Sequence, residues 1–314
     1  MSDDLNISCK VCGKTFSTER SLHAHLKAHQ ITQAEYYCRH YPRFNRLTGE
    51  PLPFKNKFDY FNKDFSTYPQ LLEWCEIAPN EEVGPYILKQ LKNRIKEKQL
   101  EYAPCHLELT QRELPPIDIY KKIFGSYSAA CEAAEVEPIY NKQIKKQFFA
   151  SSEKFNHLNI FIDTREQQPL KFANSQSLKL DFGDYTLGGD NYNYTYVDRK
   201  SESDFKSTMS TGFNRFCAEM DRAQQFQSFL YIVIESDLEK IEKNNNYGHR
   251  SNLGFIYHNM RKIIRRYPRK CQFIFTGSRS KSEEIIPKLL FFGDKIWQSD
   301  IQYYIEKYGI SCEI

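Results

Sequence analysis

The stretch "FGDYTLGGDNYNYTYVDRKSESD", residues 182–204, places acids and a lysine next to a strand-like pattern. Asp184 follows a glycine, and Asp198 and Lys200 lie two residues apart in "VDRK". Because side chains alternate along a strand, we expect Asp198 and Lys200 on one face and Arg199 on the other. Two interpretations are open. The stretch is either a solvated hairpin, the commoner use of such residues, or a carboxylate–lysine site that holds a metal ion.

Apolar runs and helical patterns alternate around this stretch. Runs typical of buried strands are "HLNIFID" (157–163), "YTYVDRK" (194–200), "FLYIVIE" (229–235) and "CQFIFT" (271–276). Helical patterns cover 202–226, 252–267 and 281–292. This alternation predicts an α/β domain with a mixed or parallel sheet flanked by helices at 157–294, followed by a C-terminal helix within 295–314.

The acids of this domain suit the hydrolysis of phosphodiester bonds. Asp163 ends the first strand, and Glu166 follows it in "DTRE". The reaction needs a cation that withdraws charge from the phosphate and lowers the pKa of a bound water. Mg²⁺ prefers carboxylate oxygens, and a nearby lysine can stabilise the charge that develops on phosphorus. Acids at strand ends together with Lys200 therefore indicate a metal-dependent phosphodiesterase site.

Residues 157–276 resemble the XPF-type nuclease domain of the PD-(D/E)XK superfamily. The family signature is Gly-Asp, a variable gap, Glu-Arg-Lys, three residues and Asp, and the family also has an Asp-x-Arg-Glu strand end similar to "DTRE" here. The resemblance implies a DNA endonuclease that uses Mg²⁺ or Mn²⁺, held by Asp163, Asp184 and Asp198. It implies catalytic roles for Asp163, Glu166, Asp184, Asp198 and Lys200, and supporting roles for Arg165, Arg199, Asp204, Arg215 and Glu219.

The chain departs from that family in two ways. Asp198 stands where the family has Glu, one methylene longer. The paired helix-hairpin-helix modules that follow the domain in eukaryotic and archaeal members are not recognisable in the residues after 276. The dimerisation and the branched-DNA preference of the family therefore do not transfer on sequence alone.

The first thirty residues match the two-cysteine, two-histidine zinc finger family. In "CKVCGKTFSTERSLHAHLKAH" the candidate ligands are Cys9, Cys12, His25 and His29, with Phe16 and Leu22 at the core positions. The spacing places the cysteines on a hairpin and both histidines on one helix face. Four such ligands close a tetrahedral Zn²⁺ site, and metal binding folds a unit too small to fold alone.

Base reading by this finger is not indicated. Thr18, Ser21 and Ala24 occupy the usual base-facing positions, and none offers a bidentate side chain. We expect the finger to contact phosphate instead, through Lys10, Lys14, Arg20 and Lys27. A finger that contacts protein is the alternative.

The middle of the chain is harder to assign. We expect a mixed or helical module at 31–101, a small helix-turn-helix-like module at 102–145 and a linker at 146–156. In the middle region, 86–98 has an amphipathic stripe, with Lys89, Lys92, Arg94, Lys96 and Lys98 on the polar face. That face is either simply solvated or contacts phosphate, for which Lys89, Lys92 and Lys96 are the candidates. The module at 102–145 resembles repeats found beside phage homing-type endonucleases.

Composition places this protein inside a cell. The formal net charge is only +4, so any basic surface must be local. Nine scattered cysteines, two of them in the finger, favour free thiols over disulfides, and neither a signal peptide nor a membrane span is recognisable. We expect the cytoplasm of a bacterial or phage-infected cell, or the nucleus of a eukaryote. The sequence leaves the oligomeric state open.

Three functions are compatible with these patterns. The first is a DNA endonuclease of the homing type, targeted by the modules that precede the nuclease domain. The second is a structure-specific repair or recombination nuclease. The third belongs to another class: a DNA-binding scaffold whose nuclease fold is inactive.

Overall fold

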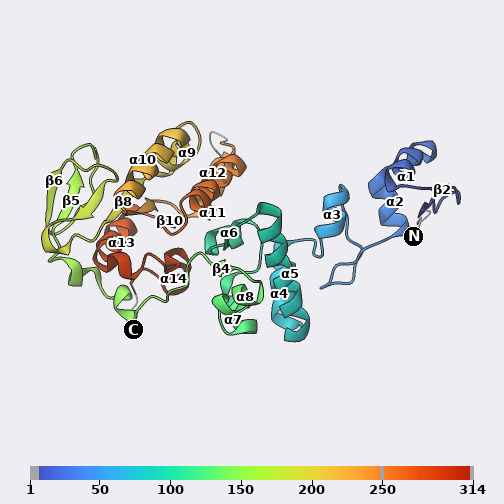
Figure 1. The fold of residues 1–314 in the computed structure, drawn as a ribbon, viewed down its shortest axis with the longest axis horizontal. Coiled ribbons are helices and arrows are strands. Elements are labelled where there is room, and N and C mark those ends of the chain that lie inside the picture. Colours follow the sequence, from blue (N-terminus) through green and yellow to red (C-terminus); the bar gives the residue numbers. More distant parts are fainter. Residues whose placement is uncertain (1–6, 248–250, 312–314) are drawn as a thin grey trace. The chain divides into compact units, whose positions relative to one another are not determined.

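The computed structural model describes residues 7–247 and 251–311 (Figure 1). The chain divides into two compact units, Met1–Pro85 and Tyr86–Ile314. The eight cysteines within the described residues are all free thiols, and Cys312 lies outside that part. No helix of the described part has both the length and the hydropathy that crossing a bilayer requires.

The first unit begins with the ββα arrangement predicted for a zinc finger. β1 (Ile7–Ser8) and β2 (Thr15–Phe16) form an antiparallel pair, followed by α1 (Glu19–His25) and the 3-10 helix η1 (Leu26–His29). Thr18 caps α1 through its side chain. A further helix, α2 (Gln33–His40), starts at a capping box between Thr32 and Glu35. Its Tyr36 is fully buried against Cys9, so the core of the finger extends beyond residue 30.

The rest of the first unit contains α3 (Lys57–Asn62) and α4 (Tyr68–Ile77). Asn45 is buried and fixes the turn before α3, because its Oδ1 accepts from the amide of Leu47 and its Nδ2 donates to Gln70. This Asn is the kind of side chain that favours turns over regular elements.

α5 (Asn80–Lys98) confirms the predicted amphipathic helix, with Ile87 and Leu91 fully buried. The prediction that Arg94 lies on the polar face, either solvated or in contact with phosphate, is wrong. Arg94 is 6% exposed, and its guanidinium lies 2.6 Å from Glu108 of α6 (His106–Gln111). A buried charge needs such a partner. Exposed lysines on α5 are Lys89, Lys92, Lys96 and Lys98.

The helix pair predicted within 102–145 is present as α7 (Ile117–Phe124) and α8 (Tyr127–Ala133). Gly125 joins them with φ 80°, a conformation that favours glycine. The parallel strands β3 (Tyr102–Ala103) and β4 (Glu137–Pro138) close the module.

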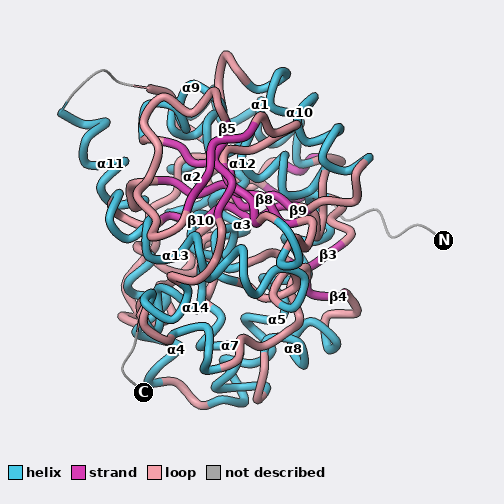
Figure 2. Tube along the Cα trace, turned by 90° about the vertical axis from the view of Figure 1, so that its left-hand side faces the viewer, coloured by secondary structure: helices cyan, strands magenta, loops and turns pink. Residues whose placement is uncertain are grey.

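A six-stranded mixed sheet forms the centre of the second unit (Figure 2). The strand order is β10-β9-β8-β7-β5-β6, and only β7 runs against its neighbours. The strands are β5 (Ile160–Asp163), β6 (Ser175–Leu178), β7 (Tyr185–Leu187), β8 (Thr195–Lys200), β9 (Phe229–Ile234) and β10 (Cys271–Phe275). The four strands expected from apolar runs are confirmed. β6 and β7 were not predicted, because β6 is polar and exposed and β7 has only three residues.

Helices cover both faces of this sheet (Figure 1). One face packs against α10 (Phe213–Gln225) and α12 (Leu253–Arg266), with α9 (Glu202–Thr208) and α11 (Leu238–Tyr247) beside them. The other packs against α13 (Arg279–Phe292) and α14 (Ile301–Tyr308). The single helical pattern predicted at 202–226 corresponds to two helices, α9 and α10, and Gly212 is the N-cap of α10.

The segment predicted as a linker also belongs to this core. It contains the 3-10 helices η2 (Lys146–Phe149) and η3 (Ser152–Phe155). Their Phe148, Phe149 and Phe155 are buried beneath the sheet with residues of α13. Two further 3-10 turns are η4 (Gly189–Asn191) and η5 (Gly293–Lys295).

Candidate catalytic and zinc centres

Three neighbouring strands bring the predicted acids together at one end of the strands. β5 and β8 both end there, and β7, which runs the opposite way, begins there. The amide of Asp163 donates to the carbonyl of Asp184 at 2.8 Å, and the amide of Asp184 donates to the carbonyl of Val197 at 2.7 Å. The backbones of the three predicted segments are therefore hydrogen-bonded side by side.

Asp198 and Lys200 share the face of β8 that carries Tyr196, as alternation predicts. Nζ of Lys200 donates to Oδ1 of Asp198 at 3.0 Å and lies 2.8 Å from Oδ2. Oδ2 is buried and lies against this ammonium group without a further hydrogen bond. The ammonium group also lies 5.4 Å from the ring centre of Phe216, a cation–π distance. Burial lowers the pKa of Lys200, but the carboxylates of Asp198, Asp184 and Glu219 together outweigh it, and the net pKa is raised, which favours the charged form.

Asp184 stands beside this pair. Burial and the nearby Asp198 carboxylate raise the pKa of Asp184 well above its usual range. One oxygen of Asp184 accepts from the amide of Arg199 at 2.7 Å, which holds the carboxylate against the end of β8. Two acids that repel each other in a poorly solvated place form the electrostatic setting in which a cation is favoured.

Glu219 of α10 reaches the same place from the helix layer. Its carboxylate accepts a 3.0 Å hydrogen bond from the amide of Gly183. Burial and Asp198 raise the pKa of Glu219. Gly183 has φ 66°, and a Cβ there would come within 3.1 Å of the carbonyl of Val197. Glycine is therefore strongly favoured at the turn that presents Asp184.

Asp163 is engaged differently. Its Oδ1 accepts from the amide and Nε of Arg165, both at 2.7 Å. Its Oδ2 accepts from the amide of Leu180 at 2.7 Å and from Arg165 at 2.8 Å. These bonds lower the pKa of Asp163 although burial opposes them. In this structure the Asp163 carboxylate therefore stabilises the loop after β5.

Arg199 points to the opposite face of the sheet from Lys200. It forms ion pairs with Glu166 at 3.0 Å and with Glu235 at 3.1 Å, and all three side chains are buried or nearly so. Arg279 of α13 adds a contact to Glu235 at 3.4 Å. Glu166, expected to assist the metal ligands, is thus paired inside an arginine–carboxylate network.

Two supporting candidates lie further out. Asp204 is exposed, and its carboxylate accepts from Ser201, the N-cap of α9, at 2.6 Å. Arg215 is exposed on α10. The structure gives Asp204 a capping role and shows no contact of Arg215 with the acids.

The acids and the zinc ligands differ in how they could hold metal. Among residues 7–247 and 251–311, the only cluster of three or more His, Cys, Asp or Glu side chains close enough to share an ion is Cys9, Cys12, His25 and His29. Asp163, Asp184 and Asp198 do not form such a cluster. The residues that fit a divalent cation are Asp184 and Asp198, because Mg²⁺ usually takes one or two carboxylates and completes its shell with water and substrate phosphate.

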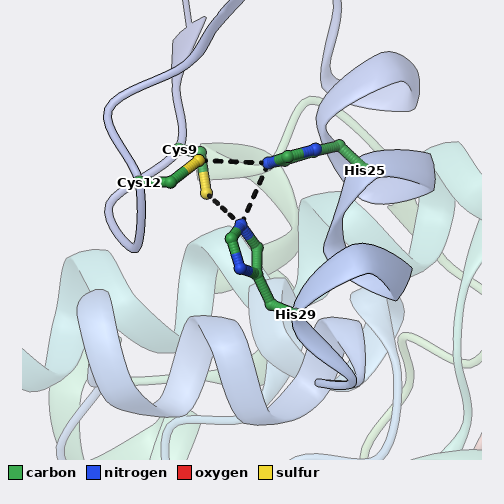
Figure 3. A group of neighbouring side chains, drawn as sticks. All are labelled: Cys9, Cys12, His25 and His29. Atoms are coloured by element: carbon green, nitrogen blue, oxygen red, sulfur yellow. Dashed lines mark hydrogen bonds between the residues drawn. The ribbon is translucent and has the colours of Figure 1, made fainter.

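The four finger side chains converge on one point (Figure 3). Sγ of Cys12 lies 3.2 Å from Nε2 of His25, Sγ of Cys9 lies 3.6 Å from Nε2 of His29, and the two Nε2 atoms are 3.0 Å apart. A tetrahedral zinc ion would separate such ligand atoms by ~3.3–3.8 Å. Burial opposes ionisation of Cys9, but the amides of Val11 and Cys12 outweigh it and lower the pKa of the thiol. The donor set therefore fits Zn²⁺.

The finger cations are available to a partner. Lys14, Arg20 and Lys27 are exposed around α1. Glu19 is paired with Lys57 of α3 at 2.6 Å. Lys10 is exposed as well, so all four cations predicted to contact phosphate are accessible.

No protein-family model matches this chain, and no curated protein matches it. Two solved structures similar to part of it are XPF from Aeropyrum pernix in complex with DNA and XPF from Aeropyrum pernix. The first has TM-score 0.34 and 17% identity over 43% of this chain and 64% of that chain. The second has TM-score 0.34 and 16% identity over 48% of this chain and 71% of that chain. The matched part thus spans less than two thirds of the first structure, and a likeness at this level carries no conclusion about the reaction.

Proposed function

We propose that this chain is a metal-dependent DNA endonuclease, with the hydrolytic site at the end of β8 and at the start of β7. The observation that carries the proposal is the ion pair between Asp198 and Lys200, with Asp184 beside it. Burial and the Asp198 carboxylate raise the pKa of Asp184. The carboxylates of Asp184, Asp198 and Glu219 face the single ammonium group of Lys200, which gives a formal charge of −2. The charges of Asp163 and Arg165 cancel and leave this sum unchanged. A divalent cation is the natural complement of that charge.

Asp184 and Asp198 would hold Mg²⁺ or Mn²⁺, which supplies a bound water of lowered pKa and withdraws charge from the phosphate. Lys200 is buried and kept charged, so its Nζ can donate to a phosphate oxygen where negative charge develops. Glu219 fixes Gly183 and thereby orients Asp184. Asp163 and Arg165 secure the adjoining loop. We propose that Arg199 and Glu166 support the end of β8 from the opposite face.

Targeting is proposed to come from the residues before the α/β domain. The finger offers Lys14, Arg20 and Lys27, and α5 offers Lys89, Lys92 and Lys96, all exposed. Cations of this kind contact phosphates without reading sequence. Both a homing-type and a structure-specific endonuclease are compatible with this arrangement, and their substrates separate them.

The test is nicking of supercoiled plasmid with Mg²⁺ by the full chain and by Lys200→Ala and Asp184→Asn. We expect the parent to nick, and each variant to be slower by about 100-fold or more, the usual effect of removing one electrostatic stabiliser. Lys295→Ala, an exposed lysine on η5, is the control. Tight binding without cleavage of any plasmid, flap or fork would instead identify a scaffold. Cutting of one cognate duplex favours homing, and preference for branched DNA favours repair or recombination.

A further inference from the structure

Residues 7–66 combine positive charge with exposed aromatic side chains. They contain ten Lys and Arg against five Asp and Glu, a formal charge of +5, whereas the whole chain carries +4. Tyr41, Phe44 and Phe61 are 38%, 54% and 59% exposed in this segment. A basic surface with accessible aromatic faces is typical of proteins that bind unpaired nucleic-acid strands.

An aromatic cavity lies in this segment between α2 and residues 54–61. Its volume is about 120 Å³. The rings that line it are those of Tyr37, Phe54, Tyr60 and Phe61, and Tyr60 lies 5.1 Å from Tyr37, 4.7 Å from Phe54 and 5.1 Å from Phe61 between ring centres. A cavity of ~150 Å³ takes one benzene ring. The cavity is smaller than that, so a base would enter it only in part and would also stack on Phe61, which lines it and is 59% exposed.

Polar and cationic groups surround the aromatic walls. Gln33 and Asn56 line the cavity, although Gln33 already contacts His23 and Asn56 accepts from the amide of Asp59 as the N-cap of α3; Lys55 and Lys57 are exposed cations at the rim. Such a combination suits a nucleobase, which has an apolar face, a polar edge and a phosphate on either side.

Two side-chain contacts connect the residues of the cavity to helix α1 of the finger. Lys57 bonds Glu19, the first residue of α1, at 2.6 Å. His23 of α1 contacts the hydroxyl of Tyr37 at 3.1 Å. The exposed Arg20 is next to Glu19 in sequence, so phosphates held by the finger would lie close to the cavity.

We infer that this aromatic cavity takes an unpaired base of a DNA strand, with Phe61 stacking on it. A base within a duplex would first have to leave its stack, at a cost of a few kcal/mol. The full chain should therefore favour DNA that has a single-stranded segment, such as a flap, gap or fork. This inference deepens the proposed function by naming a substrate class, and it rests on the DNA-binding part of that proposal alone.

The test measures binding of the zinc-loaded full chain, without Mg²⁺, to a short single strand containing 2-aminopurine and to the same sequence as a blunt duplex. We expect tighter binding of the single strand and quenching of 2-aminopurine by stacking. Phe61→Ala should weaken single-strand binding by about 5- to 150-fold and leave duplex binding nearly unchanged. Phe61 is exposed, so this variant should fold, and its zinc content verifies that.

Phe44→Ala is the matched control, because Phe44 is similarly exposed in the same unit but does not line the cavity. Equal losses for Phe44→Ala and Phe61→Ala, equal losses on single strand and duplex, or no loss for Phe61→Ala would each overturn the inference. Plasmid nicking is a separate readout. A chain that stacks the base but never cuts would refute the proposed catalysis and leave this site intact.

Discussion

Lys200 donates a hydrogen bond to the carboxylate of Asp198, 3.0 Å away and two residues earlier on the same face of β8. This pair is buried at the edge where β7 begins, next to Asp184. The arrangement leaves more negative than positive charge in a poorly solvated place, and the proposed binding of a divalent cation rests on that imbalance.

Asp184→Asn should make the folded protein more stable at neutral pH. The pKa of Asp184 is raised on folding, from about 3.9 in an unfolded chain. For an acid whose pKa is raised on folding, its contribution to stability is fully present below the pKa of the unfolded state. That contribution is lost as the pH rises through the pKa of the folded state. The gain in Tm from Asp184→Asn should therefore be clear at pH 8 and shrink towards pH 4. A gain that grows as the pH falls would contradict the raised pKa.

Arg199→Ala should destabilise the domain by about 3–5 kcal/mol, because it leaves the buried carboxylate of Glu166 without its cation and leaves Glu235 with only the longer contact to Arg279. Urea unfolding measures the loss. Arg215→Ala is the control, since this exposed arginine should change the free energy of unfolding by no more than about 0.5 kcal/mol. If Arg199→Ala is fully stable but inactive, Arg199 acts on the substrate rather than on the end of β8.

Removing zinc should unfold the finger and release α2 with it, because Tyr36 packs against Cys9. Structural zinc contributes on the order of 10–16 kcal/mol to such units. Cys9→Ser should lose the metal and helical circular dichroism, and Cys38→Ser, an exposed cysteine outside the cluster, should keep both. A zinc-free chain with unchanged helicity would show that the finger folds without metal.

Replacing Lys89, Lys92 and Lys96 by Ala should flatten the salt dependence of DNA binding. Each phosphate contact contributes about 0.9 to the slope of log K against log salt, so losing three lowers its magnitude by ~3. The same substitution of Lys240, Lys243 and Lys295, exposed lysines elsewhere, should leave the slope unchanged. An unaltered slope for the α5 variant would mean that this face is merely solvated.

Sequence reasoning succeeded where spacing or alternation carries the signal. The Cys and His spacing predicted the finger cluster, and alternation along "VDRK" placed Lys200 with Asp198 and turned Arg199 away. It could not foresee that Arg94 meets Glu108 inside the protein, since periodicity does not distinguish a solvated cation from a paired one.

Contacts between residues far apart in the sequence could not be predicted either. Glu219 reaches Gly183 from a helix 36 residues away, and only the packing of α10 on the sheet brings them together. Asp163 is held by Arg165 two residues on, although a strand-end acid followed by an arginine gives no sign of which partner the carboxylate takes. The α2 helix, whose Tyr36 completes the core of the finger, carries no metal ligand to mark it.

The placement of a divalent ion is tested most directly by anomalous diffraction from crystals of the full chain soaked in Mn²⁺. The structure predicts a peak in contact with the carboxylates of Asp184 and Asp198, with Asp163 still bonded to Arg165, and its loss in Asp184→Asn crystals. A peak elsewhere, or no peak at Mn²⁺ concentrations that support cleavage, would contradict the proposed metal site.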